Sequence, residues 1–300
     1  MTDFTDADEI LEGPPPLVDG ERLVSGYEVK AHLSRGNHLD VYEAWSEERA
    51  CRVIAKTPRP DCLEDRETVR ALTREGRLLK KFTHPHIVRA YEVLKEPQPV
   101  VILETLTGAT LEYLIDTRAR RLAISEIVHL GLHLCSALHY LHRQGVLHLD
   151  LKPSNIISEC RLAKIIDLSI ARPPGRGIGY TGTDQYMAPE QVTGDHLSPA
   201  TDVWGVGAVL WETATGEEPF NADDEDDDLW EDATDEEPFD DEDDDLWEPT
   251  YEQLERRIVP IRSYRRVPAA FASLVESCLE PDPAHRPTVD ELREGLAALA

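Results

Sequence analysis

The residues best suited to do chemistry lie close together near the middle of the chain. Residues 148–155 read His-Leu-Asp-Leu-Lys-Pro-Ser-Asn and contain Asp150, Lys152 and Asn155, and Asp167 follows twelve positions later. Asp150 can accept or orient the proton of a hydroxyl group, and Lys152 can lie against a transferring phosphate. Asn155 and Asp167 offer the oxygen ligands that a hard cation such as Mg²⁺ prefers. These residue types at this spacing favour phosphoryl transfer.

The 300 residues, 41% of them hydrophobic, suffice for one large domain or two lobes. The formal net charge of −28 is unevenly distributed, because residues 217–248 contain 20 acids, residues 1–21 contain 7, and neither segment has a Lys or Arg. The remainder has 32 acids and 31 bases and is therefore almost neutral. Since nucleic-acid binding needs at least a basic surface, the composition does not support a nucleic-acid partner.

Five cysteines are scattered along the chain without C-x-x-C spacing or neighbouring metal ligands: Cys51, Cys62, Cys135, Cys160 and Cys278. This pattern is typical of reduced thiols. The N-terminus carries acids where a signal peptide needs basic and then apolar residues, and no run of about 18 apolar residues is present to span a bilayer. Together these features predict a cytoplasmic protein without a membrane span.

The distribution of apolar and turn-forming residues predicts three regions. Residues 1–26 are acidic and contain three consecutive prolines, which is typical of a flexible leader. Residues 27–106 contain short apolar runs around one helical stretch, and residues 107–300 are dominated by helical patterns. We expect strands near 27–33, 41–45, 52–56, 87–94 and 100–103, and helices at 67–82, 125–142 with Ser125 as its cap, 200–213, 270–279 and 289–299.

The acidic segment at 217–248 contains a duplicated unit. Residues 224–231 recur unchanged as residues 241–248, and each copy has one tryptophan, Trp230 or Trp247. Two strongly acidic copies are too few for a stacked repeat fold, so we expect a solvated loop. It could dock a basic partner with the tryptophans as anchors, fold back onto nearby arginines, or have no fixed partner, which is the simplest interpretation. The arginines in question are Arg256, Arg257, Arg262, Arg265 and Arg266.

Several motifs in a fixed order resemble those of the eukaryotic-type (Hanks-type) serine/threonine protein kinase family, from about residue 27 to 299. Lys56 ends a Val-Ile-Ala-Lys motif on a predicted strand, and Glu75 lies in the helix that follows. Residues 148–155 match the catalytic loop of the family, and Asp167 begins the counterpart of its D-F-G motif, here Asp-Leu-Ser. Lys152 in its slot suggests serine and threonine as acceptors.

The resemblance implies an α+β, bilobal protein-kinase-like fold. Residues 27–106 would form a small N-lobe with an antiparallel sheet and one helix, and residues 107–300 a larger, mainly helical C-lobe that carries the insert at 217–248. The implied catalytic residues are Asp150, Lys152, Lys56 and Glu75. Asp150 would accept the proton, Lys152 would neutralise charge, and Lys56 would grip the α and β phosphates while paired with Glu75.

The resemblance also implies the cofactors. Asn155 and Asp167 would bind Mg²⁺, with Mn²⁺ as an alternative, and ATP would be the phosphoryl donor. The residues implied to contact the nucleotide are Gly36, Val41, Lys56, Glu104, Leu106 and Ile157. The partners would be proteins with serine or threonine acceptors, and the acidic loop favours basic ones.

Features in the last third of the chain resemble the substrate platform of protein kinases. Residues 182–190 match the end of an activation segment, Asp202 would brace the backbone of the catalytic loop, and Arg286 would pair with Glu190. Small-molecule kinases share the catalytic acids but need no such platform for an extended peptide. This part of the sequence therefore favours protein substrates.

The sequence departs from the family pattern mainly around the nucleotide. The glycine-rich loop reads Ser-Arg-Gly-Asn-His-Leu-Asp-Val, in which Leu39 stands where a glycine would let the backbone approach the phosphates. Ile54 stands two residues before Lys56, on the same strand face, where a larger side chain would press on the adenine. Ser169 replaces the flexible glycine of D-F-G, so an inverted inactive state should be harder to reach. Leu149 replaces the arginine that in many members receives an activation-loop phosphate, so loop phosphorylation is predicted to be dispensable.

Two hypotheses from different classes follow. The first is a cytoplasmic serine/threonine protein kinase that transfers the γ-phosphoryl group of Mg-ATP to a protein hydroxyl, since every charged catalytic position is filled. The alternative is a catalytically impaired, kinase-like binding module with an acidic docking loop, which the altered glycine-rich loop favours. Loss of loop glycines weakens positioning, whereas loss of a metal-binding acid or the base removes the electrostatic stabilisation of the transition state. A small-molecule phosphotransferase is a third and weaker interpretation.

Overall fold

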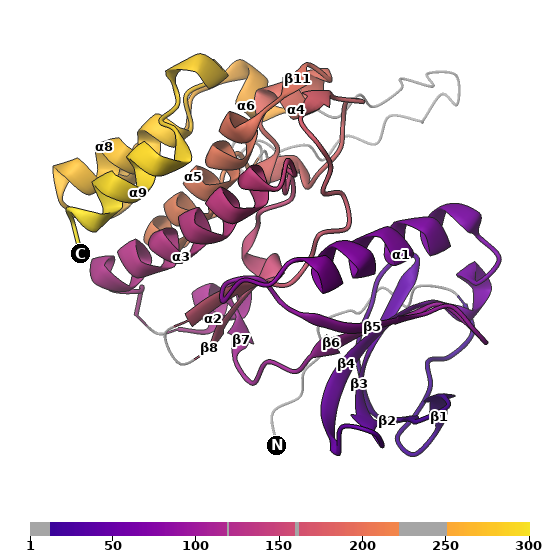
Figure 1. The fold of residues 1–300 in the computed structure, drawn as a ribbon. Coiled ribbons are helices and arrows are strands. Elements are labelled where there is room, and N and C mark those ends of the chain that lie inside the picture. Colours follow the sequence, from indigo (N-terminus) through magenta and orange to yellow (C-terminus); the bar gives the residue numbers. More distant parts are fainter. Residues whose placement is uncertain (1–12, 119, 160–161, 222–250) are drawn as a thin grey trace, which may run out of the picture. The chain divides into compact units, whose positions relative to one another are not determined.

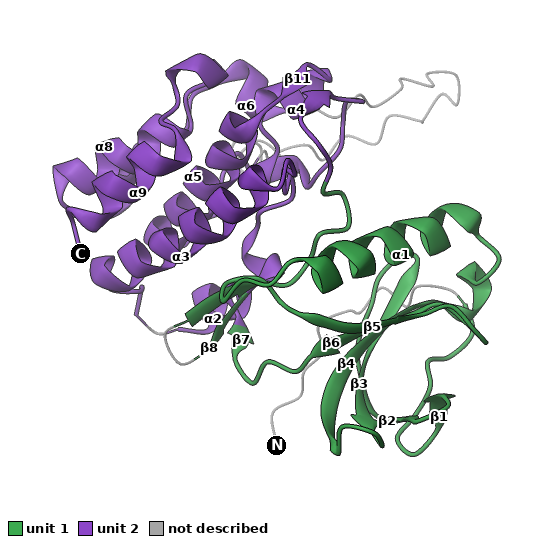
Figure 2. Cartoon of the chain, in the orientation of Figure 1, with its two compact units in different colours: residues 1–109, 157–171 green, residues 110–156, 172–300 purple. Residues whose placement is uncertain are grey.

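The computed structural model describes residues 13–118, 120–159, 162–221 and 251–300 (Figure 1). The start of the predicted leader, Cys160, and the duplicated acidic unit with Trp230 and Trp247 lie outside the described residues. The chain divides into two compact units, unit 1 with residues 1–109 and 157–171, and unit 2 with residues 110–156 and 172–300 (Figure 2).

Unit 1 is built around an antiparallel sheet of six strands in the order β1-β2-β3-β4-β6-β5. The strands are β1 Arg22–Val24, β2 Tyr27–Arg35, β3 Leu39–Ser46, β4 Cys51–Pro58, β5 Ala90–Leu94 and β6 Val100–Glu104. Strands β8 Ile156–Glu159 and β9 Leu162–Ile165 belong to a separate three-stranded sheet with β7 Ala109–Thr110. The antiparallel sheet expected for the first lobe is therefore present.

The alternation of side chains gives the main sheet two different faces. One face carries a hydrophobic core in which Tyr42, Ala44, Val53, Ala55, Val100 and Ile102 are buried, with Leu17 packed against it. The opposite face carries Val41 and Lys56, which pair across β3 and β4, and Val101, which pairs with Lys56 across β4 and β6. Val41 and Lys56, two of the residues expected to contact a nucleotide, thus share the second face.

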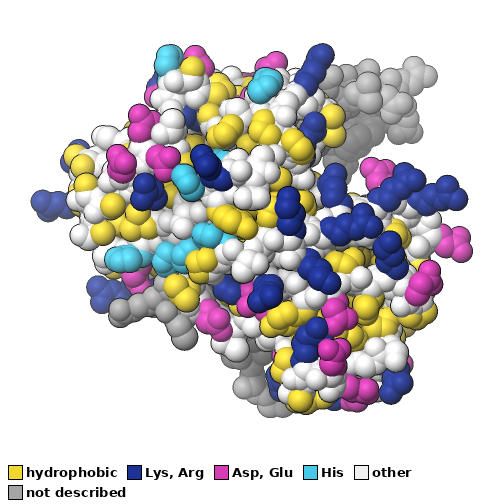
Figure 3. All heavy atoms as spheres, viewed as in Figure 1, with side chains coloured by type: hydrophobic (Ala, Val, Ile, Leu, Met, Phe, Trp, Pro, Cys, Tyr) yellow, Lys and Arg dark blue, Asp and Glu magenta, His cyan; other side chains and the backbone are white. Residues whose placement is uncertain are grey.

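Helix α1, Arg66–Lys81, packs on this second face. The side chain of Asp65 caps its first turn by accepting the backbone N–H groups of Glu67 and Thr68. Gly76 allows a close approach, because a Cβ there would lie 2.6 Å from a methyl group of Val101. Basic side chains gather over the exposed side of α1 (Figure 3), and they are Arg66, Arg70, Arg74, Arg77, Lys80 and Lys81.

The predicted leader and the predicted division after residue 106 both need correction. Residues 22–24 form strand β1, and Leu23 and Val24 are only 6% and 4% exposed, so the ordered part of unit 1 begins before Tyr27. Two apolar residues after a proline-rich stretch are too short a signal for a strand. Residues 157–171 return to unit 1, where Ile165 bridges to Ile87 and accepts the N–H of Val88 at 2.8 Å. The prediction placed one boundary in the sequence, and one boundary cannot describe a unit that is made of two separate segments.

Unit 2 is mainly helical, as expected. Its helices are α2 Leu111–Thr117, α3 Ile124–Arg143, α4 Pro189–Thr193, α5 Pro199–Thr215, α6 Glu252–Glu255, α7 Ile261–Tyr264, α8 Ala269–Cys278 and α9 Val289–Ala297, and strands β10 Gly175–Arg176 and β11 His196–Leu197 form a small pair. Helix α5 is buried on all sides and packs against α3 and α8. Gly207 permits the α5–α8 contact, since a Cβ there would lie 2.6 Å from that of Cys278.

Helix α3 begins without the predicted cap. Its N-cap is Ala123 rather than Ser125, and the carboxylate of Glu126 accepts the backbone N–H of Ala123 at 2.8 Å. The glutamate at the third helical position thus takes part in capping the helix, and the helix begins before the serine that the sequence suggested as its cap. Among the described helices, none combines the length and the apolar character needed to cross a membrane.

Candidate active site

In unit 1, three of the predicted site residues meet in one buried cluster. The ammonium group of Lys56 on β4 donates to Glu75 Oε1 at 2.8 Å and to Asp167 Oδ2 at 2.7 Å, so the predicted ion pair with Glu75 is present. Lys56 is 8% exposed and Glu75 is 1% exposed. Burial alone lowers the pKa of Lys56, but the two carboxylates outweigh burial and raise it above its ordinary value. Lys56 is therefore a permanent cation at this position.

Asp167 is held at both of its oxygens. Oδ2 accepts the ammonium group of Lys56, and Oδ1 accepts the backbone N–H of Ser169 at 2.7 Å. Although burial favours the neutral acid, these contacts lower the pKa of Asp167, so it is an ionised carboxylate. The carbonyl of Ser169 accepts Arg74 from α1 at 2.8 Å, and Leu168 is buried at 1% exposure. Leu168 thus takes the hydrophobic position expected of the phenylalanine in D-F-G.

The other predicted nucleotide contacts also lie in unit 1. Gly36 is in the turn between β2 and β3, and Val41 is on β3 opposite Lys56. Glu104 ends β6, and its carboxylate is occupied by the N–H of Arg89 at 3.0 Å and the ammonium group of Lys164 at 2.5 Å. Two partly buried residues complete the set, Leu106 after β6 and Ile157 on β8.

In unit 2, the catalytic-loop residues form a second cluster with Thr183. Asp150 Oδ1 accepts the hydroxyl of Thr183 at 2.8 Å, and the ammonium group of Lys152 donates to the same hydroxyl oxygen at 2.8 Å. Asn155 Nδ2 donates to Asp150 Oδ2 at 2.9 Å and to the carbonyl of Asp150 at 3.0 Å. Asp150 and Lys152 thus act together on one hydroxyl group.

The backbone of the catalytic loop is held by Asp202 from α5, as predicted. Its carboxylate accepts the N–H groups of His148 at 2.9 Å and Leu149 at 2.8 Å, and it contacts His142 Nε2 at 2.7 Å. Leu149 has a φ of 71°, a conformation that is unfavourable for a side chain with a Cβ. These contacts explain how a buried leucine is kept in that conformation.

Gln191 is a contact residue that the sequence analysis missed. Its side chain is 4% exposed, and Nε2 donates to the carbonyl of Leu149 at 2.9 Å and to that of Thr181 at 2.8 Å. The amide therefore joins the catalytic loop to the activation segment within unit 2. The sequence did offer a signal for this residue, because Gln191 directly follows Glu190, the last residue of the motif at 182–190.

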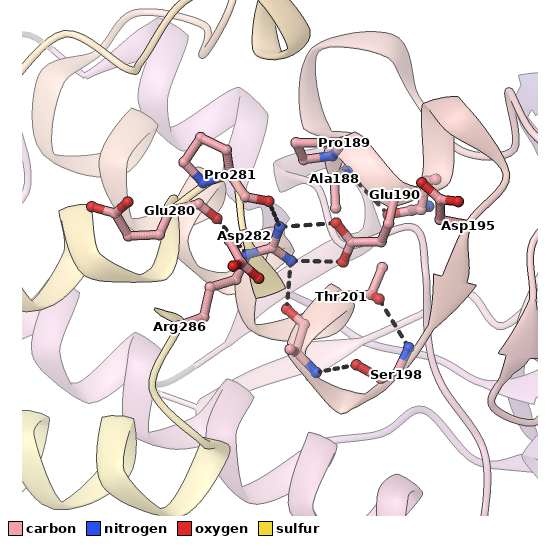
Figure 4. Close-up of polar contacts among 12 residues, drawn as sticks. Ala188, Pro189, Glu190, Asp195, Ser198, Thr201, Glu280, Pro281, Asp282 and Arg286 are labelled. Carbon is pink, nitrogen blue, oxygen red and sulfur yellow. Dashed lines mark hydrogen bonds and ion pairs between the residues drawn. The ribbon is translucent and has the colours of Figure 1, made fainter. Parts of the chain in front are cut away.

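The predicted pair of Glu190 and Arg286 forms a buried fork (Figure 4). Arg286 Nη1 and Nη2 donate to Glu190 Oε1 and Oε2 at 2.7 and 2.8 Å. Arg286 also donates to the carbonyl groups of Glu280, Ala200 and Pro281 at 2.7, 3.0 and 3.0 Å. All its donors are therefore used, and it fixes α4 to the C-terminal part of unit 2.

A second acid on α5, Glu212, is buried beside Tyr186, whose hydroxyl donates to Glu212 Oε2 at 2.6 Å. Burial and, to a smaller extent, the acidic neighbours Glu218 and Glu112 together raise the pKa of Glu212 to about 8. At neutral pH this side chain is therefore largely protonated. It ties the activation segment to α5 without a full charge.

The ion pair of Lys56 and Glu75 lies in unit 1, and the contact of Asp150 with a hydroxyl group lies in unit 2. The protein kinase domain family matches residues 27–295, and the chain belongs to this family. It is 30% identical to a probable serine/threonine-protein kinase of Streptomyces coelicolor, over 69% of this chain and 32% of that protein. It is 32% identical to the serine/threonine-protein kinase PknB of Mycobacterium leprae, over 70% of this chain and 35% of the relative, and to PknB of Mycobacterium tuberculosis, over 67% and 34%. The chain thus spans about a third of the length of these relatives.

Proposed function

We propose that this chain is an ATP-dependent serine/threonine protein kinase. The observation that carries the proposal is the hydroxyl of Thr183, which donates to Asp150 and accepts from Lys152. A substrate hydroxyl in the same relation to Asp150 would be oriented for attack and would find a base for its proton. The names of the relatives support serine and threonine as the acceptors.

The donor set fits ATP and a divalent cation. When bound, ATP with Mg²⁺ or Mn²⁺ supplies the γ-phosphoryl group and neutralises part of its charge. The ionised carboxylate of Asp167 and the amide oxygen of Asn155 are oxygen ligands of the type these cations prefer, and the Asn155 amide nitrogen is already turned toward Asp150. Asp167 belongs to unit 1 and Asn155 to unit 2, and both are the residues that the resemblance to the family assigns to the cation.

Each catalytic residue then has one task. Lys56 holds its positive charge for the phosphates, and Glu75 fixes the direction of its ammonium group. Asp150 orients the substrate hydroxyl and takes its proton as the new oxygen–phosphorus bond forms and ADP leaves. Lys152 offsets negative charge near the acceptor oxygen. A cytoplasmic location, a preference for basic substrates and the nucleotide contacts of Gly36, Val41, Glu104, Leu106 and Ile157 belong to the same proposal.

The test is phosphorylation of the chain itself and of a generic basic protein with Mg-ATP. Asp150→Ala should lower kcat at least about a hundredfold, the effect of losing a general base, and Asp167→Ala should abolish transfer. Asp19→Ala, which removes an exposed acid of unit 1, is the matched control and should keep native activity. A native chain that does not phosphorylate either target, but is stabilised by ATP, would support the impaired binding module instead.

A further inference from the structure

This inference rests on the proposed function, because it concerns the β2–β3 hairpin that would cover the nucleotide phosphates. The hairpin contains a buried carboxylate, that of Asp40, with 0% exposure. It accepts Nε and Nη2 of Arg35 at 2.8 and 2.9 Å, and the hydroxyl of Tyr42 at 3.3 Å, and it contacts His32 Nε2 at 3.1 Å. Burial alone raises the pKa of Asp40, but hydrogen bonds from Arg35 and His32 lower it below its ordinary value. The hairpin therefore encloses an ionised acid, which is costly unless its partners stay in place.

The same groups bind the segment that precedes the sheet. Arg35 Nη1 donates to the carbonyl of Pro14 at 2.8 Å, and the hydroxyl of Tyr42 accepts the N–H of Leu17 at 3.1 Å. The side chain of Leu17 packs against the core of the sheet. Residues 14–17 are thus fastened to the back of the hairpin by two hydrogen bonds and one apolar contact, although their composition alone predicted a flexible leader.

The turn itself is held from its other side. Arg59, which follows β4, donates from Nη1 to the carbonyl of Asn37 at 3.2 Å and from its backbone N–H to the carbonyl of His38 at 2.9 Å. Within the turn, the N–H of Gly36 donates to the carbonyl of Leu39 at 2.8 Å. In this three-residue turn the N–H of Gly36 and the carbonyl groups of Asn37 and His38 therefore all have hydrogen-bond partners. Gly36 is the only glycine of the turn.

The contacts of Asp40 and Tyr42 lie on the face of the sheet opposite to the one that would bind the nucleotide. Successive side chains on a strand point to opposite faces, so Asp40 and Tyr42 share one face of β3 while Val41 has the other and pairs with Lys56. The ion pair can therefore set the conformation of the hairpin without competing with phosphates for space. Arg35 and Asp40 are also the last β2–β3 pair before the turn, where such a constraint acts most directly on the tip.

We propose that Arg35 and Asp40 are positioning residues for ATP, and that with Tyr42 and residues 14–17 they form a hairpin brace. The brace keeps the phosphate-covering hairpin in one conformation, where other members of the family rely on flexible glycines. A hairpin that is already ordered loses less conformational entropy when the nucleotide binds. The brace thus compensates for Leu39, which denies the backbone the freedom of glycine, and it makes residues 14–17 part of the nucleotide-binding unit.

The first experiment measures the Kd of Mg-ATP by calorimetry, and KM for ATP separately from kcat. Asp40→Asn keeps the shape but removes the charge, and it should raise both Kd and KM about tenfold while kcat at saturating ATP stays within about twofold. Arg35→Lys keeps the charge but loses the fork and the Pro14 contact, so it should give an intermediate rise. The matched control is Arg52→Ala, which removes an exposed ion pair with Glu43 between β3 and β4 and should leave Kd unchanged.

The second experiment needs no nucleotide, so it separates failure of the brace from failure of the proposed kinase activity. Amide hydrogen exchange of residues 36–39 should be at least about tenfold faster in Asp40→Asn than in the native chain. Tyr42→Phe, which keeps the ring but removes the hydroxyl, should give a smaller increase and covers the case in which Asp40→Asn does not fold. Faster exchange in a chain that does not bind ATP would retain the brace and reject the kinase assignment. Native exchange in Arg35→Lys and Tyr42→Phe would overturn the brace.

Discussion

The strongest test of the architecture of unit 2 is the substitution Arg286→Ala. The side chain of Arg286 is 0% exposed, that of Glu190 is 5% exposed, and the guanidinium carbon lies 4.9 Å from the centre of the Trp204 ring. Its removal leaves the Glu190 carboxylate buried without its cation and leaves three carbonyl groups without this donor. Breaking a buried pair on one side costs about 3–5 kcal/mol, so we expect a loss of about 4 kcal/mol in the free energy of unfolding.

Urea unfolding followed by tryptophan fluorescence and by circular dichroism measures this loss. With a denaturant slope of about 3 kcal/mol per molar, a loss of about 4 kcal/mol lowers the midpoint by more than about 1 M. Arg257→Ala is the matched control, because its ion pair with Glu280 at 3.0 Å is on the surface, with Arg257 72% exposed, and should be worth less than about 1 kcal/mol. If both substitutions moved the midpoint by the same small amount, the burial argument for Arg286 would be refuted.

Two further predictions concern the activation segment of unit 2. Because the pKa of Glu212 is raised from 4.5 to about 8, the folded protein binds a proton that the unfolded chain releases, so stability falls as pH rises from 4.5 to 8, by on the order of 5 kcal/mol. Glu212→Gln has no proton to lose, so its free energy of unfolding relative to that of the native chain should rise between pH 6 and pH 9 when both are measured by urea unfolding. A difference that does not change with pH would contradict the raised pKa of Glu212. Thr181→Ala should keep activity within about threefold, because Gln191 holds the carbonyl of Thr181 and not its side chain, whereas Thr183→Ala removes the hydroxyl shared by the catalytic residues and should cost about tenfold. If Thr181→Ala lost peptide phosphorylation completely, as fully as Thr183→Ala, loop phosphorylation would be required.

Much of this fold could be predicted from the sequence because its signals are local. Alternating apolar residues indicated the strands of unit 1 from Tyr27 onward, and residues 148–155 carried Asp150, Lys152 and Asn155 at a constrained spacing. Features that depend on distant segments were missed. The brace joins Pro14, Arg35 and Asp40 through a buried charge, and a single acid between two apolar residues has no pattern that distinguishes it from a surface charge. Residues 157–171 were misassigned for the same reason, since only the folded chain shows that they return to unit 1.

Two of the departures from the family pattern, at Leu149 and in the glycine-rich loop, have a common physical consequence. Leu149 occupies the place of an arginine that could receive a phosphate, and its φ of 71° is a strained conformation that costs about 1–3 kcal/mol. Permanent hydrogen bonds offset this cost, since its N–H donates to Asp202 and its carbonyl accepts the amide of Gln191. In unit 1 the ion pair of Arg35 and Asp40 likewise fixes a hairpin in which glycines are missing. In unit 2 permanent hydrogen bonds stand where other members of the family have a phosphate-binding arginine, and in unit 1 an ion pair stands where they have flexible glycines. We therefore expect the chain to be active without prior phosphorylation.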